Sequence, residues 1–181
     1  MTSWVRRLVD RLTGRAVPEG FTGELANEEH VVAVAPLGAS GHLVATSHGL
    51  WVPDGRRISW HLISKVTWGE GRFTVIEADA VGESGRAVLL RDRPAVRYTV
   101  AEPGKLPEAV HRRVTGSIRA THHRELPGGG AWFVQRKVPG RDGVVLQVRA
   151  DEGTDAGVVE RLAAEVAERM RAAEESAQRL T

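Results

Sequence analysis

Histidines come nearest to a metal-binding pattern in this chain. His42 and His48 stand six residues apart in a run that predicts one strand, so both side chains would share a face and could supply two zinc ligands. A zinc site needs three or four ligands, and the sequence places no third ligand at a diagnostic spacing. We interpret both residues as half-buried strand histidines, and we expect neither a metal nor another cofactor.

Serines in glycine-rich stretches are the nearest approach to a catalytic nucleophile. Ser40 lies in Gly-Ala-Ser-Gly and Ser84 in Gly-Glu-Ser-Gly, but neither has the G-x-S-x-G spacing or the preceding buried strand of a nucleophile elbow. The acidic pairs at 28–29 and 174–175 have no apolar setting that would raise a carboxyl pKa for general-acid catalysis. The sequence therefore predicts turns and surface pairs, and we do not expect an enzyme.

Composition favours an ordinary globular protein. The chain has 181 residues, of which 41% are hydrophobic and 27% charged; its net charge is +2, and its basic residues are almost all arginine. It contains no cysteine, which excludes disulfides and fits a reducing compartment. No apolar run approaches the ~20 residues that cross a bilayer, and charges interrupt residues 1–14, which therefore make a poor signal peptide. We expect a cytoplasmic protein, with peripheral membrane association as the alternative.

A basic arm is expected at the start of the chain. Residues 1–13 place apolar side chains at helical spacing with arginines between them, which predicts a short amphipathic helix, and residues 14–28 are typical of a linker. Such a helix could lie on an anionic membrane surface. Its candidate contacts are Trp4, Arg6, Arg7 and Arg11.

Short strands dominate the next part of the chain. Turn formers separate about seven runs with strand character, which favours an antiparallel barrel or sandwich because the connections are too short for crossover helices. The predicted runs are 31–35, 42–52, 58–60, 66–68, 72–78, 87–90 and 95–100. Trp51, Trp60, Trp68 and Trp132 stand among apolar residues rather than arginines, which predicts core packing instead of base stacking.

A helix is expected over residues 105–123. Its apolar residues recur every four positions from Leu106 to Ile118, which predicts one face packed on the barrel. The opposite face would carry a second set of candidate anionic-surface contacts, His111, Arg112, Arg119, His122 and His123. The pair His122 and His123 is typical of a solvated helix end.

A hairpin and a long helix complete the chain. Residues 128–130 are expected to end the first helix, after which 131–138 and 144–149 form the hairpin and 155–180 form an amphipathic helix with Thr154 as its N-cap. We expect residues 155–170 to pack on the hairpin near Trp132 and Val134 and residues 172–181 to project. The alternative is a homodimer seam along this helix.

One stretch resembles a known fold family. Thr46, Gly49, Leu50 and Trp51, followed by Gly-Arg-Arg-Ile-Ser-Trp at 55–60 and an isoleucine-to-valine corner at 63–66, resemble bacterial pleckstrin-homology-like and GRAM domains. The resemblance covers residues 30–123 and implies an α+β fold, a barrel of about seven antiparallel strands capped by a helix. The phosphoinositide-binding members have basic first loops, whereas the loop here, 36–41, is uncharged, so that activity is not implied.

The resemblance also sets the expected domains. They are an arm and linker at 1–28, a pleckstrin-homology-like domain at 29–125, and an additional hairpin and helix at 126–181. The run at 128–134, Gly-Gly-Gly-Ala-Trp-Phe-Val, further resembles a set of uncharacterised actinobacterial proteins.

These features favour a non-catalytic module that binds a protein or peptide. The first alternative is a peripheral membrane or anionic-lipid-binding module that uses the basic arm. The second is nucleic-acid binding through the arginines of the first predicted helix, which we favour least.

Overall fold

The computed structural model describes residues 17–139, 141 and 143–179, which form two compact units. Of these residues, the first unit holds 17–77 and 94–116, and the second holds the remainder. The units are therefore interleaved in the sequence. The amphipathic helix predicted at 1–13 lies outside the described residues.

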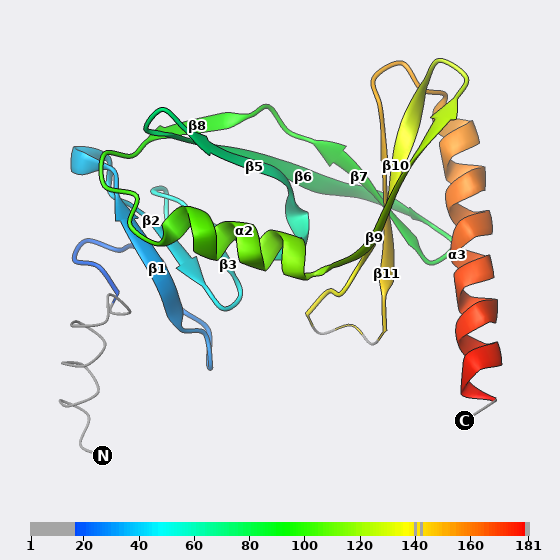
Figure 1. The fold of residues 1–181 in the computed structure, drawn as a ribbon, viewed down its shortest axis with the longest axis horizontal. Helices are drawn as coiled ribbons and strands as arrows, with labels where there is room; N and C mark the ends of the chain where they lie inside the picture. Colours follow the sequence, from blue (N-terminus) through cyan, green and yellow to red (C-terminus); the bar gives the residue numbers. More distant parts are fainter. Residues whose placement is uncertain (1–16, 140, 142, 180–181) are drawn as a thin grey trace. The chain divides into compact units, whose positions relative to one another are not determined.

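The first unit begins with a four-stranded antiparallel sheet in which each strand pairs with the next (Figure 1). Its strands are β1 (Val31–Pro36), β2 (His42–Thr46), β3 (Gly49–Trp51) and β4 (Arg57–Ser59).

The single strand predicted over 42–52 is wrong, because the chain reverses between β2 and β3. The Thr46 hydroxyl stabilises the turn by accepting hydrogen bonds from the amides of His48 and Gly49, at 3.2 and 3.1 Å. His42 and His48 consequently do not share a strand.

Three further strands and a helix complete the first unit. The first part of β6 (Arg72–Ser84) pairs with β5 (Ile63–Gly69) on one side and with β8 (Val96–Thr99) on the other. Helix α2 (Leu106–Gly116) buries Leu106, Val110 and Val114 in the core of this unit. Short 3-10 turns, η1 (Gly38–Ser40) and η2 (Trp60–Leu62), connect β1 to β2 and β4 to β5.

The tryptophans divide between core and surface. Trp51 and Trp60 are only 6% and 5% exposed, which confirms the packing prediction for these two residues. Trp68 and Trp132 are 39% and 36% exposed, so the prediction is wrong for them.

The second unit is a mixed sheet with one long helix (Figure 1). The strand order is β6, β7 (Ala87–Asp92), β11 (Val145–Ala150), β10 (Gly129–Arg136) and β9 (Ile118–Leu126), with β7 and β11 parallel and the other pairs antiparallel. The hairpin predicted from 131–138 and 144–149 is confirmed as β10 and β11. The chain is therefore an α+β protein with a mixed sheet, a separate four-stranded sheet and a C-terminal helix.

The helix predicted over 105–123 is too long. Helix α2 ends at Gly116, and Ile118 begins β9, which pairs with β10 from Gly129 to Arg136. The four-residue apolar repeat includes Ile118 by coincidence, because pairing between strands overrides a local helical pattern. Residues 128–130 end no helix: Gly128 adopts a φ of +85° in the turn between β9 and β10.

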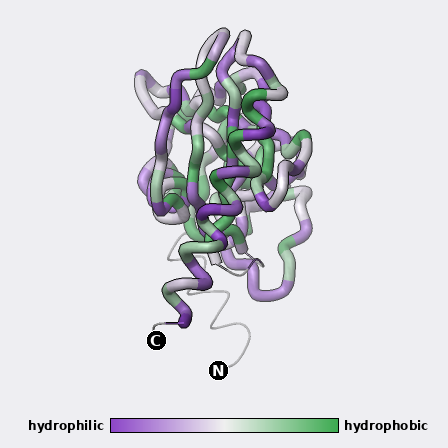
Figure 2. The backbone as a smooth tube through the Cα atoms, turned by 90° about the vertical axis from the view of Figure 1, so that its right-hand side faces the viewer, coloured by the Kyte–Doolittle hydropathy of each residue, from purple (hydrophilic) through white to green (hydrophobic). Residues whose placement is uncertain are grey.

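Helix α3 (Ala156–Gln178) packs on the sheet through small residues. Val159, Ala163 and Ala167 are buried among side chains that include Ala131, Phe133, Leu146 and Val148. The predicted packing of this helix on the hairpin of β10 and β11 is confirmed, but through Ala131 and Phe133, which alternate with the expected Trp132 and Val134. Hydrophilic residues interrupt the last turns of α3 (Figure 2).

The N-cap of α3 differs from expectation. The N-cap is Asp155, whose side chain accepts a hydrogen bond from the Val158 amide, whereas Thr154 hydrogen-bonds Gly130.

Among the residues that the structure describes, no helix is long and apolar enough to cross a membrane.

Candidate binding site at the edge of the second sheet

Strand β9 is the last strand of the second unit's sheet. In the described part of the chain it pairs with β10 alone, so its outer edge presents main-chain groups that no other strand engages. Its residues from Arg119 to Glu125 are all exposed. An edge of this kind can accept an additional strand through backbone hydrogen bonds.

A groove runs between this edge and α3. Strand alternation and the register with β10 place His122 opposite Phe133 and Ala120 opposite Gln135, on the face that packs against the helix. The groove has a volume of about 500 Å³. Leu162 and Val166, at the margin of α3, line its other side and are only partly buried.

Positive side chains predominate on this strand. Arg119 and Arg124 outnumber Glu125, the single acidic residue of β9. No carboxylate in the described ranges forms an ion pair with Arg119 or Arg124. Both guanidinium groups are therefore available to a negatively charged partner.

His123 lies on the opposite face of β9 from His122. Its Nε2 lies 2.7 Å from Oδ2 of Asp151, and its ring packs against Trp132 with 4.8 Å between ring centroids. Gly130 permits this arrangement, since a Cβ at that position would lie 2.6 Å from His123 Nε2. The two histidines are thus separated by strand alternation, and the prediction of a solvated helix end is wrong.

The structure does not bring all the predicted contacts together. His111 and Arg112 lie on α2 in the first unit, where Arg112 forms an ion pair with Glu108, four residues earlier. Arg119, His122 and His123 lie on β9 in the second unit. Trp4, Arg6, Arg7 and Arg11 lie outside the described residues.

Sequence reasoning missed a buried carboxylate in the first unit. Glu29, expected on the surface, has a fully buried side chain just before β1. It accepts hydrogen bonds from the Thr46 hydroxyl at 2.5 Å, Trp51 Nε1 at 2.9 Å and the Ala26 amide at 3.0 Å, and it forms an ion pair with Arg57 at 2.5 Å. No local pattern in the sequence marks it, because all but one of these partners lie far along the chain.

Burial and hydrogen bonding act on Glu29 in opposite directions. Burial raises the pKa of this carboxyl, but the hydrogen bonds from Thr46, Trp51 and Ala26, together with the charge of Arg57, lower the pKa further than burial raises it. Glu29 is therefore ionised, and its hydrogen bonds and ion pair hold residues 26–29 against β2, β3 and β4.

Neither of the other chemical patterns forms a reactive site. Ser84 donates a 2.8 Å hydrogen bond to the Glu160 carbonyl, and no basic side chain in the described part of the chain hydrogen-bonds its hydroxyl. Within the described ranges, no group of three or more histidine, aspartate and glutamate residues is arranged to hold a metal ion.

Comparisons with protein-family models, with curated proteins and with solved structures found no match to this chain.

Proposed function

We propose that this protein is a non-catalytic interaction module that binds an extended, acidic segment of a partner protein along β9. The observation that carries the proposal is the free edge of β9 beside a partly apolar groove. A segment added to this edge would gain main-chain hydrogen bonds, which supply affinity without requiring a particular sequence.

The groove supplies selectivity for side chains. Alternate side chains of an added strand would point toward α3, where Leu162 and Val166 offer apolar contact. Acidic residues on the other face of the segment would meet Arg119, which lies next to the groove-facing Ala120 and does not line the groove. A second copy of β9 fits less well, because it would bring further arginines to the same edge, and like charges on neighbouring strands oppose pairing.

We further propose that the first unit is a pleckstrin-homology-like domain. Its four-stranded antiparallel sheet, its second sheet of β5, β6 and β8, and its closing helix α2 support this reading. In this reading, residues 78–93 are an extension of the domain, and residues 117–181 join that extension to form the second unit. Scaffolds of this family are used mainly for binding, which agrees with an interaction module.

Fluorescence anisotropy with a designed probe tests the proposed function. The probe is a fluorescein-labelled peptide of about eight residues that alternates valine and glutamate, a length that matches one strand. We expect it to bind the full chain, and we expect weaker binding after N-methylation of alternate residues, because methylation removes main-chain donors. A peptide that alternates valine and lysine should bind at least about tenfold more weakly.

Two charge-reversal variants provide the matched comparison. Arg119→Glu should weaken binding of the acidic peptide about tenfold, whereas Arg112→Glu, on α2, makes the same change in net charge and should leave binding unchanged. Equal binding of the N-methylated peptide would contradict strand addition. Binding to anionic vesicles or to DNA with no peptide binding would instead favour a membrane or nucleic-acid function.

A further inference from the structure

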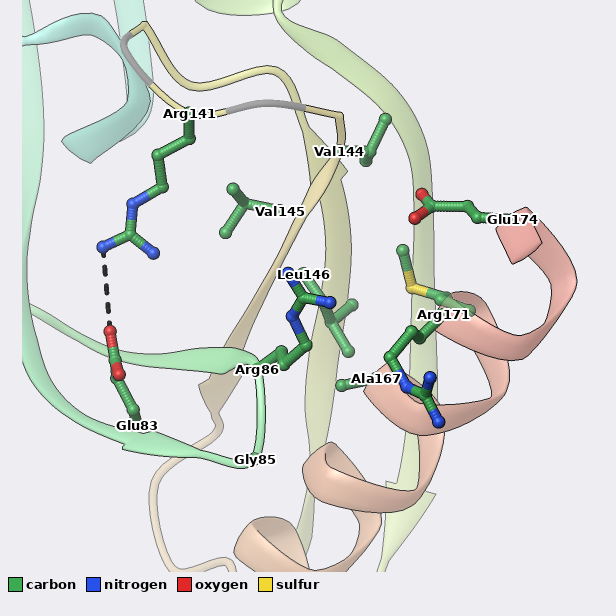
Figure 3. Close-up of a pocket in the computed structure, with 11 residues that line it drawn as sticks. Glu83, Gly85, Arg86, Arg141, Val144, Val145, Leu146, Ala167, Arg171 and Glu174 are labelled. Carbon is green, nitrogen blue, oxygen red and sulfur yellow. Dashed lines mark ion pairs between the residues drawn. The ribbon is translucent and has the colours of Figure 1, made fainter. Parts of the chain in front are cut away.

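A separate pocket lies in the second unit, between the β6–β7 turn, the end of the β10–β11 loop and α3 (Figure 3). Its volume is about 460 Å³, which falls within the range of small-molecule sites. Leu146, Ala167 and Met170 supply apolar surface, and Arg86, Arg141 and Arg171 supply positive charge. None of these residues belongs to β9.

The β6–β7 turn positions Arg86 at this pocket. Ser84 pairs with Ala87, which leaves Gly85 and Arg86 as a two-residue turn, and Gly85 adopts a φ of +58°. Ser84 Oγ donates to the Glu160 carbonyl, so the turn is attached to α3. A Cβ at Gly85 would lie 3.5 Å from Ala164 Cα, which shows how closely the turn approaches the helix.

The three arginines differ in how many of their hydrogen-bond donors are already used in ion pairs with neighbouring carboxylates. Arg171 is held by Glu168 and Glu175 on its own helix. Arg141 lies 3.7 Å from Glu83, which is too long for a hydrogen bond. Arg86 forms no ion pair with any residue that the structure describes, and its charge acts on Glu168 only at longer range.

Arg86 therefore keeps its hydrogen-bond donors available beside an apolar surface. Figure 3 shows the Arg86 side chain extending from the turn toward Leu146, and the Arg141 side chain directed toward Glu83. A planar guanidinium in this setting favours a carboxylate or phosphate, which it can bind with two parallel hydrogen bonds.

We propose that this pocket binds a small molecule that carries one anionic group, a carboxylate or a phosphate, on an apolar body. The anionic group binds Arg86, with Arg141 as a second contact, and the apolar body covers Leu146, Ala167 and Met170. An inorganic anion would leave the apolar surface exposed to water, and a neutral apolar molecule would cover Arg86 without a partner. Glu83 and Glu174 line the same pocket and disfavour ligands with more than one anionic group.

Titrations of the full chain with four probes test this assignment. Octanoate and octyl phosphate carry an anionic group on an apolar body, octanol lacks the charge, and inorganic phosphate lacks the apolar body. We expect both amphiphilic anions to bind and to shift the amide resonances of Arg86 and Met170 in ¹H–¹⁵N spectra. Octanol and inorganic phosphate should bind at least about tenfold more weakly. The stronger of the two amphiphiles identifies the preferred anionic group.

Matched variants separate this pocket from non-specific binding. Arg86→Gln should weaken octanoate binding about tenfold because the carboxylate loses its partner. Met170→Gln should also weaken octanoate binding, because the alkyl chain loses apolar contact. Arg169→Gln removes an exposed charge from α3 outside the pocket and should have no effect. The proposal is overturned if octanol binds as tightly as octanoate, or if Arg86→Gln binds octanoate like the unaltered chain. The peptide assay on β9 is independent of this result.

Discussion

Nε2 of His123 lies 2.7 Å from Oδ2 of Asp151, so a side-chain contact joins the middle of β9 to the residue that follows β11. The Asp151 amide also donates to the Gly130 carbonyl, at the start of β10. Strand β9 is thus held by more than its ladder with β10. This contact stabilises the proposed peptide-binding edge without occupying it.

Removal of the His123 side chain should loosen the edge strand. Because each side chain of the pair is about one-third exposed, we expect His123→Ala to cost about 0.5–1 kcal/mol in the free energy of unfolding. Hydrogen exchange of the β9 amides should become faster. His122→Ala, on the other face, should leave the free energy of unfolding nearly unchanged but weaken binding of the acidic peptide. The opposite pattern would contradict the assigned faces.

Replacement of Glu29 should be much more costly. Glu29→Gln leaves Arg57 without its carboxylate and weakens the hydrogen bonds from Thr46 and Trp51, so we expect a loss of about 3 kcal/mol at neutral pH. Chemical denaturation measures this loss. Glu28→Gln, one residue earlier and exposed, provides the control and should change little.

The same substitution should alter the dependence of stability on pH. The folded pKa of Glu29 lies below its unfolded value, so its contribution is complete above the unfolded pKa of about 4.3 and is lost as pH falls through the folded pKa. The difference in stability between the unaltered chain and Glu29→Gln should therefore shrink with acidification below about pH 4.3. A difference that grows on acidification would contradict the lowered pKa.

Glycine 128 combines two constraints that a control can separate. A Cβ there would lie 2.4 Å from the Gly153 carbonyl oxygen, and the residue has a positive φ. Gly104 also has a positive φ, but a Cβ would meet nothing within 4 Å. We expect Gly104→Ala to cost about 1 kcal/mol and Gly128→Ala at least about 2 kcal/mol in thermal denaturation. Equal costs would show that the Gly153 contact can relax.

The small residues of α3 allow a test of the dimer alternative. Ala163 is fully buried in the second unit's core, so Ala163→Leu should cost about 1–3 kcal/mol through overpacking, whereas Ala173→Leu, which is exposed, should cost little. In the packing described here, Tm should not depend on protein concentration. A concentration-dependent Tm, with Ala173→Leu raising it, would favour a homodimer through α3.

The fold could be predicted where local patterns and tertiary packing agree. The strands near 31–35, 72–78 and 87–90, the hairpin of β10 and β11, and α3 all have an apolar period that matches their final environment. The extent of α2 could not be predicted, because β10, which pairs with residues 118–126, lies later in the chain. Likewise, the turn within 42–52 is set by the pairing of β2 with β3 and by the hydrogen bonds of the Thr46 hydroxyl, neither of which has a recognisable sequence pattern.

The candidate sites were less accessible to sequence reasoning. The sequence pattern identifies Arg119, His122 and His123 as surface groups but places them on a helix, so it does not reveal the edge strand or its groove. Arg86 carries no recognisable motif, and its position depends on a turn that is attached to α3 through Ser84. Recognition of either site requires knowledge of which distant elements meet in space.

Strand β6 belongs to both units, and this has a consequence for synthesis on the ribosome. Residues 72–77 can complete the first unit once 94–116 have been made, but the β6–β7 extension then still lacks β11 and α3. Ala87 and Leu89, which those later elements cover, would be open to water or to other nascent chains during this interval. A chain that stops at Gly116 would keep this apolar strand pair uncovered permanently, and we expect it to aggregate unless 78–93 are also removed.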